Sequence, residues 1–433
     1  MNEIRSFHWT EKMEFFNLAA MLITVPIDSG TSLLFSVFWM LSVILKNTIL
    51  KRWSFFGWHQ DKNFQYGKSQ YFLIPVLCYW FAYLLSLLWT ENMTTGWGEI
   101  GELIWFLVLP LTCVCTDFRQ FSEKLVRVML WSFVLTLSVL FVLLLSIKVV
   151  KACASAEYSF LWFMMNEDFY YIHHAYMALY ILTGLAFLYS ELVRKEKQDA
   201  RLTVLSVVCA CCMVLFLLCI NSRAGLLCLI ILMAFCWVHQ CFVRKKYRFA
   251  LISLVIASLV VVGSHFALPE YFRRLSETIV QVANGDKSDG RFEIYEKTWM
   301  VLKDNMLLGV GAGDRMDELI PYYDSEEEAY CPHNQYLDTW MTTGVVGLLS
   351  LLAMLIVPLV MALRKRHIFS FLFLLMLMVS LLFESMWERQ MGIVFTAVIY
   401  IYMLLLFQLD SRKIAHTELP GNSSDISVPD HQQ

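Results

Sequence analysis

The stretch LTVLSVVCACCMVLFLLCI, residues 202–220, decides the fold, because it contains no charged residue. An α-helix of this length crosses the roughly 30 Å hydrocarbon core of a bilayer. Similar runs of about 17 to 24 residues recur along the chain, which has 433 residues and is 58% hydrophobic and only 16% charged. A soluble domain carries about a quarter charged residues. The composition therefore predicts an all-α, polytopic membrane protein.

Twelve apolar runs predict about twelve transmembrane helices. The segment 101–116 is short and contains Pro110, so a re-entrant segment is the alternative there. The predicted spans are 13–28, 31–47, 71–90, 101–116, 125–147, 172–190, 202–220, 223–241, 248–267, 336–361, 367–384 and 391–408.

The distribution of basic residues orients these spans. Most of the 34 lysines and arginines fall in alternate loops and in the two termini. Because positively charged loops stay in the cytoplasm, we expect both termini to be cytoplasmic. The same rule places the long segment 268–335 outside the membrane.

The chain is expected to have three parts. Residues 1–200 hold about six spans, residues 201–410 form a core that includes the loop 268–335, and residues 411–433 form a disordered cytoplasmic tail. Most of the 12 cysteines lie in apolar runs, where helix packing is their default role. Cys153 and Cys331 lie in outside segments, and whether they pair is left open. No basic patch indicates a nucleic-acid partner, and no ligand spacing indicates a metal.

The outside segment 268–335 carries the strongest functional signals, since structureless loops of such length are uncommon. Residues 269–282 and 291–302 have apolar positions at helical spacing and predict amphipathic helices on the bilayer surface. Glycines at positions 309, 311 and 313 permit positive φ and close backbone approach. His333 then lies directly before the next predicted span.

Three motifs appear in a fixed order. The first is the outside turn 221–225 (NSRAG), between two spans. The second is 290–299 (GRFEIYEKTW), which runs into 307–313 (LLGVGAG). The third is 333–337 (HNQYL), followed by 344–348 (GVVGL). In this order the motifs resemble those of the O-antigen ligase and O-antigen polymerase superfamily, over residues 200–400.

The resemblance implies a metal-independent glycosyltransferase without a cofactor. Its donor would be a glycan on undecaprenyl diphosphate, and its acceptor another glycan or lipid A-core, within a membrane lipid environment. The reaction would occur at the extracytoplasmic face of a bacterial cytoplasmic (inner) membrane.

The chemistry of this reaction assigns roles to three residues. The leaving diphosphate gathers negative charge, which arginine binds through its planar fork, so Arg223 and Arg291 are the diphosphate-binding candidates. An unactivated hydroxyl acceptor needs a base, and His333 is the catalytic candidate. Each has a structural alternative: Arg223 can anchor a span end at the interface, Arg291 can be an exposed helix-start residue, and His333 can be a surface or capping residue.

Other residues near the outside face are supporting candidates. Asn334 is expected to orient the histidine or cap the following helix. Arg389, Glu384 and Glu388 lie in a turn at the membrane edge. Ionisable groups at such a position are candidates for a functional role, and structural pairing is the alternative. His173 and His174 are candidates to line an acceptor groove.

Several functions are compatible with these motifs and candidate residues. We favour a ligase that attaches a finished glycan, with a polymerase that joins lipid-linked repeat units as the alternative. A protein O-glycan transferase would differ only in its acceptor. A transporter of the lipid-linked glycan is the rival from another class, although charges deep within spans and paired internal repeats, which are typical of transporters, are absent from the sequence.

Overall fold

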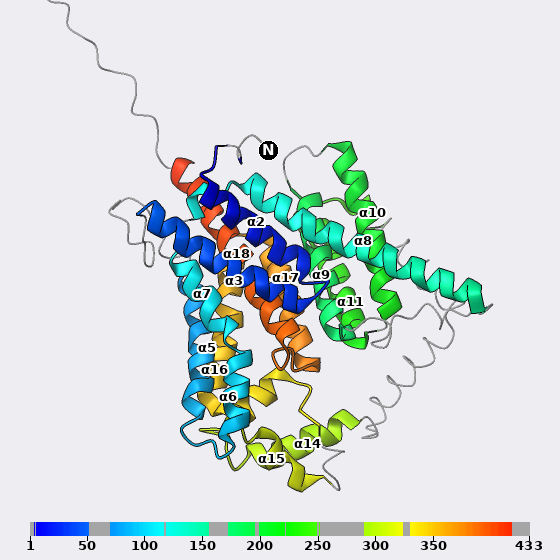
Figure 1. Ribbon diagram of the computed structural model, residues 1–433. Helices are drawn as coiled ribbons and strands as arrows, with labels where there is room; N and C mark the ends of the chain where they lie inside the picture. Colours follow the sequence, from blue (N-terminus) through cyan, green and yellow to red (C-terminus); the bar gives the residue numbers. More distant parts are fainter. Residues whose placement is uncertain are drawn as a thin grey trace, which may run out of the picture.

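The computed structural model describes residues 4, 6–51, 70–116, 118–155, 172–194, 199–220, 222–248, 251, 290–323 and 330–417. Within these residues the regular elements are helices (Figure 1). They are α2 (Trp9–Thr24), α3 (Ser29–Ile49), η1 (Tyr71–Leu73), α5 (Ile74–Ser86), α6 (Met93–Glu102), α7 (Trp105–Val114), η2 (Phe118–Gln120), α8 (Glu123–Ser155), α9 (His174–Leu192), α10 (Ala200–Ile220), α11 (Arg223–Val238), η4 (His239–Val243), α14 (Gly290–Leu302), α15 (Arg315–Leu319), η5 (Ile320–Tyr322), α16 (Gln335–Arg364), α17 (Ile368–Phe383) and α18 (Gln390–Thr417).

Eight helices in the described part of the chain are long and apolar enough to span a membrane. Helix α2, the helix Tyr71–Ser86 and α17 lie at three further predicted positions but are shorter. The predicted span 248–267 lies almost entirely outside the described residues. The polytopic helical membrane fold is therefore confirmed, and the total of twelve spans stays a prediction. The eight are Ser29–Ile49, Met93–Val114, Glu123–Ser155, His174–Leu192, Ala200–Ile220, Arg223–Val243, Gln335–Arg364 and Gln390–Leu409.

Two ends of predicted elements differ from the structure. The span predicted at 101–116 begins earlier, at Met93, where the Oδ1 atom of Asn92 accepts a hydrogen bond from the Thr95 backbone amide (3.2 Å) and caps α6. The α6 segment contains polar residues, so hydropathy alone does not indicate that the helical segment starts there. Helix α18 continues to Thr417, past residue 411, where a disordered tail is predicted; residues 418–433 lie outside the described residues.

Helices α9 and α18 lie at the centre of the bundle. In the most apolar stretch of each helix, 78% of the residues of α9 and 94% of those of α18 are buried, whereas the share is 28% for the segment Arg223–Val243. Buried tyrosine hydroxyls on both helices donate to backbone carbonyls: Tyr180 to Met391 (2.8 Å) and Tyr402 to Leu18 (2.8 Å). Because these hydroxyls have partners, the aromatic rings are buried at little cost.

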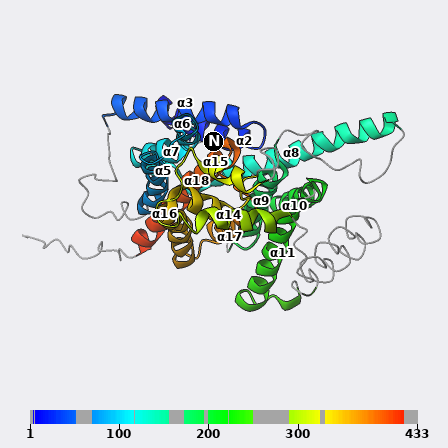
Figure 2. The ribbon, with the colours of Figure 1, turned by 90° about the horizontal axis from the view of Figure 1, so that it is seen from below.

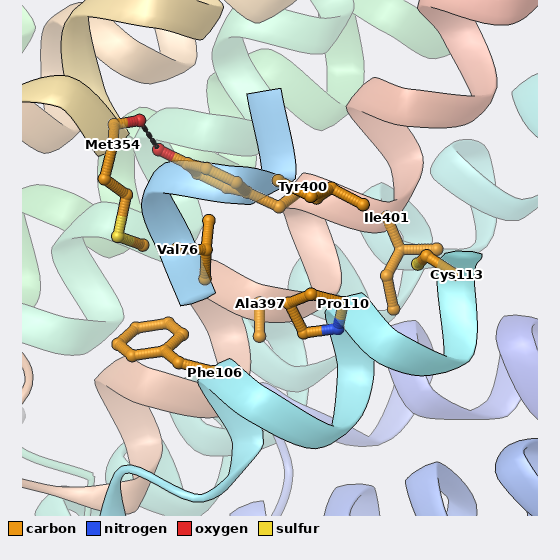
Figure 3. A pocket seen from close by; sticks show the side chains of 9 residues that line it. Val76, Phe106, Pro110, Cys113, Met354, Ala397, Tyr400 and Ile401 are labelled. Carbon is orange, nitrogen blue, oxygen red and sulfur yellow. Dashed lines mark hydrogen bonds between the residues drawn. The ribbon is translucent and has the colours of Figure 1, made fainter. Parts of the chain in front are cut away.

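A small apolar space lies beside Pro110, between α5, α7, α16 and α18 (Figure 3). Its volume is about 10 Å³, close to the minimum that one water molecule needs. The one hydrogen bond drawn there runs from the Tyr400 hydroxyl to the Met354 carbonyl (2.8 Å). The space is therefore a feature of helix packing and too small for a glycan.

Helix α16 is broken at Gly344, whose φ is +67°. The break frees backbone groups, and the segment 307–311 satisfies them: the amides of Val310 and Gly311 donate to the carbonyls of Met341 (2.8 Å) and Thr342 (3.0 Å). A Cβ atom at Gly344 would lie 2.1 Å from the Leu307 carbonyl oxygen. The predicted positive φ is confirmed at positions 309 and 311, where it serves close contact between backbones.

The described part of the long loop forms a small platform at one end of the bundle. Helices α14 and α15 lie at the end opposite the start of α2 and the end of α18 (Figure 1), and they cross the ends of the central helices when seen from below (Figure 2). The platform has its own apolar core against α16, and the Asp314 carboxylate accepts hydrogen bonds from the backbone amides of Glu91 (2.8 Å) and Asn92 (2.7 Å). The residues of this core are Val301, Leu302, Val310, Leu319 and Met341.

Candidate functional site

His333 lies immediately before α16 at the platform end. Its φ is +46°, an uncommon value for a residue with a side chain. The next residue, Asn334, caps α16, because its Oδ1 atom accepts from the amides of Tyr336 (3.0 Å) and Leu337 (3.2 Å). The expected capping role of Asn334 is thus seen in the structure. Because Asn334 is the N-cap residue, α16 begins directly after it and His333 lies just outside the helix.

The His333 imidazole pairs with a carboxylate. Its Nδ1 atom lies 3.0 Å from Oε1 of Glu384, and the two side chains are 36% and 14% exposed. A carboxylate on one ring nitrogen fixes the orientation and tautomer of the ring. Glu384 follows α17 directly as its C-cap residue. Two candidates that are 51 residues apart in the sequence therefore form one unit.

The turn 384–389 is held against the start of α16 by a second contact. The amide of Trp387 donates to Oε1 of Gln335 (2.7 Å). The Trp387 indole is buried and packs against Tyr79 and Phe106, with ring centroids 5.1 Å away in both cases. Arg389, in the same turn, is exposed.

A cavity of about 170 Å³ has both Arg223 and Glu384 in its lining. Arg223 is the first residue of α11 and is exposed, while Oγ of the preceding Ser222 accepts from the Gly225 amide (3.2 Å) and caps the helix. Glu384 lines the same cavity. The candidate diphosphate ligand therefore shares a cavity with the carboxylate partner of His333, while His333 itself is not among the lining residues. The complete lining is His174, Ala175, Ala178, Ser222, Arg223, Ala224, Gly225, Ser380, Phe383, Glu384 and Met386.

The two histidines before α9 differ in position. The Nδ1 atom of His173 accepts from the Ala175 amide (3.4 Å) and caps α9, whereas His174 lines the cavity. Of the two groove candidates, only His174 lines this cavity.

Arg291 is located through its helix. It occupies the first turn of α14. The hydroxyl of Tyr295, four residues later, donates to the Leu382 carbonyl (3.4 Å), two residues before Glu384. This contact places α14 beside the end of α17.

Sequence reasoning missed Arg315, at the start of α15. This residue is only 7% exposed, and its guanidinium contacts Asp338, Glu99 and Glu388. Burial alone lowers an arginine pKa, but the carboxylates outweigh it and raise the pKa of Arg315, so the side chain stays charged. Three acidic residues from distant parts of the sequence surround one arginine, a pairing that no local motif indicates.

The cysteine question left open by the sequence is answered: Cys153 and Cys331 are both free thiols. Sγ of Cys331 donates to Oε1 of Glu388 (2.8 Å). Burial raises the pKa of the Cys331 thiol well above its usual range. In the described residues, no three His, Cys, Asp or Glu side chains are grouped so that they could hold a metal ion.

Comparison with protein families identifies the segment that contains this site. Residues 207–352 match the family described as O-Antigen ligase, whereas the search of curated proteins found no match. The matched segment includes Arg223, Arg291, Arg315 and His333, and the predicted motifs lie within it in their expected order. Residues 207–352 of this helical membrane protein are thus similar to the O-antigen ligase family.

Proposed function

We propose that the protein transfers a glycan from undecaprenyl diphosphate to an acceptor hydroxyl at the extracytoplasmic face of the bacterial cytoplasmic membrane, as a ligase. The observation that carries the proposal is the convergence of His333, Glu384 and Arg223. His333 pairs with Glu384, and Glu384 shares a cavity with Arg223.

Arg223 binds the donor diphosphate in this proposal. Its guanidinium can contact two phosphate oxygens at once and remains charged throughout the reaction. Negative charge accumulates on the phosphate oxygen as the bond to the sugar C1 atom breaks, and a fixed cation there lowers the barrier. Arg291 is the second ligand in this proposal, because it lies in the first turn of α14 and α14 contacts the end of α17.

His333 takes the proton of the acceptor. The acceptor oxygen forms a new bond to C1, the bond from C1 to the phosphate oxygen breaks, and undecaprenyl diphosphate departs. The hydroxyl proton passes to Nε2 of His333, while Nδ1 stays on Glu384, whose carboxylate stabilises the resulting imidazolium.

Glycan profiling of cells tests the proposal. Cells that lack the protein would be complemented with the wild type or with His333→Ala. Accumulation of unattached, carrier-linked polymer of normal length indicates a ligase. Persistence of single repeat units indicates the alternative, a polymerase. A normal profile with His333→Ala would show that the proposed base is wrong.

A further inference from the structure

We propose, on the basis of the proposed function, that Arg315 is a positioning residue for the transfer reaction. It clamps the turn 384–389 to the start of α16 and thereby holds Glu384 against His333.

The contacts of Arg315 connect the two chain segments that carry the pair. Its Nη1 atom donates to both carboxylate oxygens of Asp338 (3.0 and 3.1 Å), in the first turn of α16. Its Nη2 atom donates to Glu388 (3.1 Å), four residues after Glu384. One guanidinium therefore bridges the helix that follows His333 and the turn that contains Glu384.

The position of the clamp is itself fixed. The neighbouring Asp314 carboxylate accepts from the amides of Glu91 and Asn92, and the amides of Val310 and Gly311 are bonded to carbonyls of α16. Arg315 is thus held by the platform on both sides. Because Arg315 donates to Glu388, the platform resists displacement of Glu388.

The chemistry of the clamp requires an arginine. Nη2 also contacts Glu99 (3.3 Å), so three carboxylates from α6, α16 and the turn surround one cation. Without the cation these like charges repel each other and push the turn away from α16. A lysine retains the charge, but its single ammonium group lacks the planar fork that bridges two carboxylates.

The test is a double-variant cycle on the transfer rate, measured in membranes that have accumulated the lipid-linked glycan. If Arg315 acts through Glu384, Arg315→Lys lowers the rate about 10-fold in the wild type and less than about 3-fold in a Glu384→Gln background. The concentration of donor that gives half-maximal rate stays within about 3-fold, because Arg315 does not contact the donor.

Arg127 provides a matched control. It pairs with Glu191 on α9, 17 residues and therefore about 26 Å along the helix from His174. Arg127→Lys loosens an arginine–carboxylate pair of the same kind, and its effect is expected to be equal in both backgrounds.

Equal losses for Arg315→Lys in the two backgrounds would overturn the positioning role, because general destabilisation is additive. If Arg315→Lys does not accumulate in membranes, Glu388→Gln is used in its place. Glu388 is 28% exposed, and removing its charge leaves the ion pair between Arg315 and Asp338 intact. Glu388→Gln is then expected to lower the rate more in the wild type than in the Glu384→Gln background. An active His333→Ala variant would instead overturn the proposed function. An inactive His333→Ala variant together with additive Arg315 effects would overturn the clamp alone.

Discussion

Glu384→Gln isolates the contribution of the carboxylate to the proposed base. The substitution keeps the shape of the side chain and removes its charge, while Nδ1 of His333 stays within 3.0 Å of the same position. A hydrogen bond to a charged group contributes about 1.5–3 kcal/mol, and the Glu384 side chain is only 14% exposed, so solvent screens it weakly. At about 1.36 kcal/mol per tenfold change in rate, the transfer rate is expected to fall about 10- to 150-fold.

The assay follows conversion of accumulated lipid-linked glycan to product in membrane vesicles, normalised to the amount of protein in the membrane. Glu293→Gln is the control, because Glu293 is 62% exposed and forms an ion pair with Lys297, one turn later in α14. We expect the control to retain the wild-type rate. A Glu384→Gln protein as active as the control would refute the role of the carboxylate in catalysis.

Four further predictions concern binding, metal use, stability and reactivity. Arg223→Lys should lose most of the transfer activity, since an ammonium cannot bind two phosphate oxygens as a guanidinium does; full activity would favour a role as an interface anchor. EDTA should leave the transfer rate unchanged, and a requirement for added divalent cation would contradict the metal-independent reaction. Gly344→Ala should lower the thermal midpoint of the solubilised protein, because φ is +67° and the new Cβ would lie 2.1 Å from the Leu307 oxygen. A residue with a side chain in this backbone region costs about 1–3 kcal/mol. Cys331 should react slowly with iodoacetamide near pH 7.5 in the native protein and rapidly after unfolding, because burial raises the pKa of its thiol and only the thiolate attacks. The rate of labelling is measured by mass spectrometry of the peptide that contains Cys331.

The sequence alone was sufficient for the class of the molecule. A bilayer demands long apolar helices, and the run 202–220 meets that demand without reference to any other part of the chain. Local patterns also predicted the cap at Asn334 and the positive φ at Gly309 and Gly311, because these properties depend on a few neighbouring residues. The ordered motifs led to the family that residues 207–352 match.

Only the tertiary structure decided which charges meet. His333 and Glu384 were separate candidates until the packing of α16 against α17 brought them within 3.0 Å, and Arg315 had no local signal that it binds Asp338 and Glu388. The partner of a buried charge depends on how distant helices pack, and hydropathy and short motifs carry no information about that packing. The sequence therefore determined that the protein is a helical membrane protein with a segment similar to the O-antigen ligase family, and the fold determined how its ionisable groups are arranged.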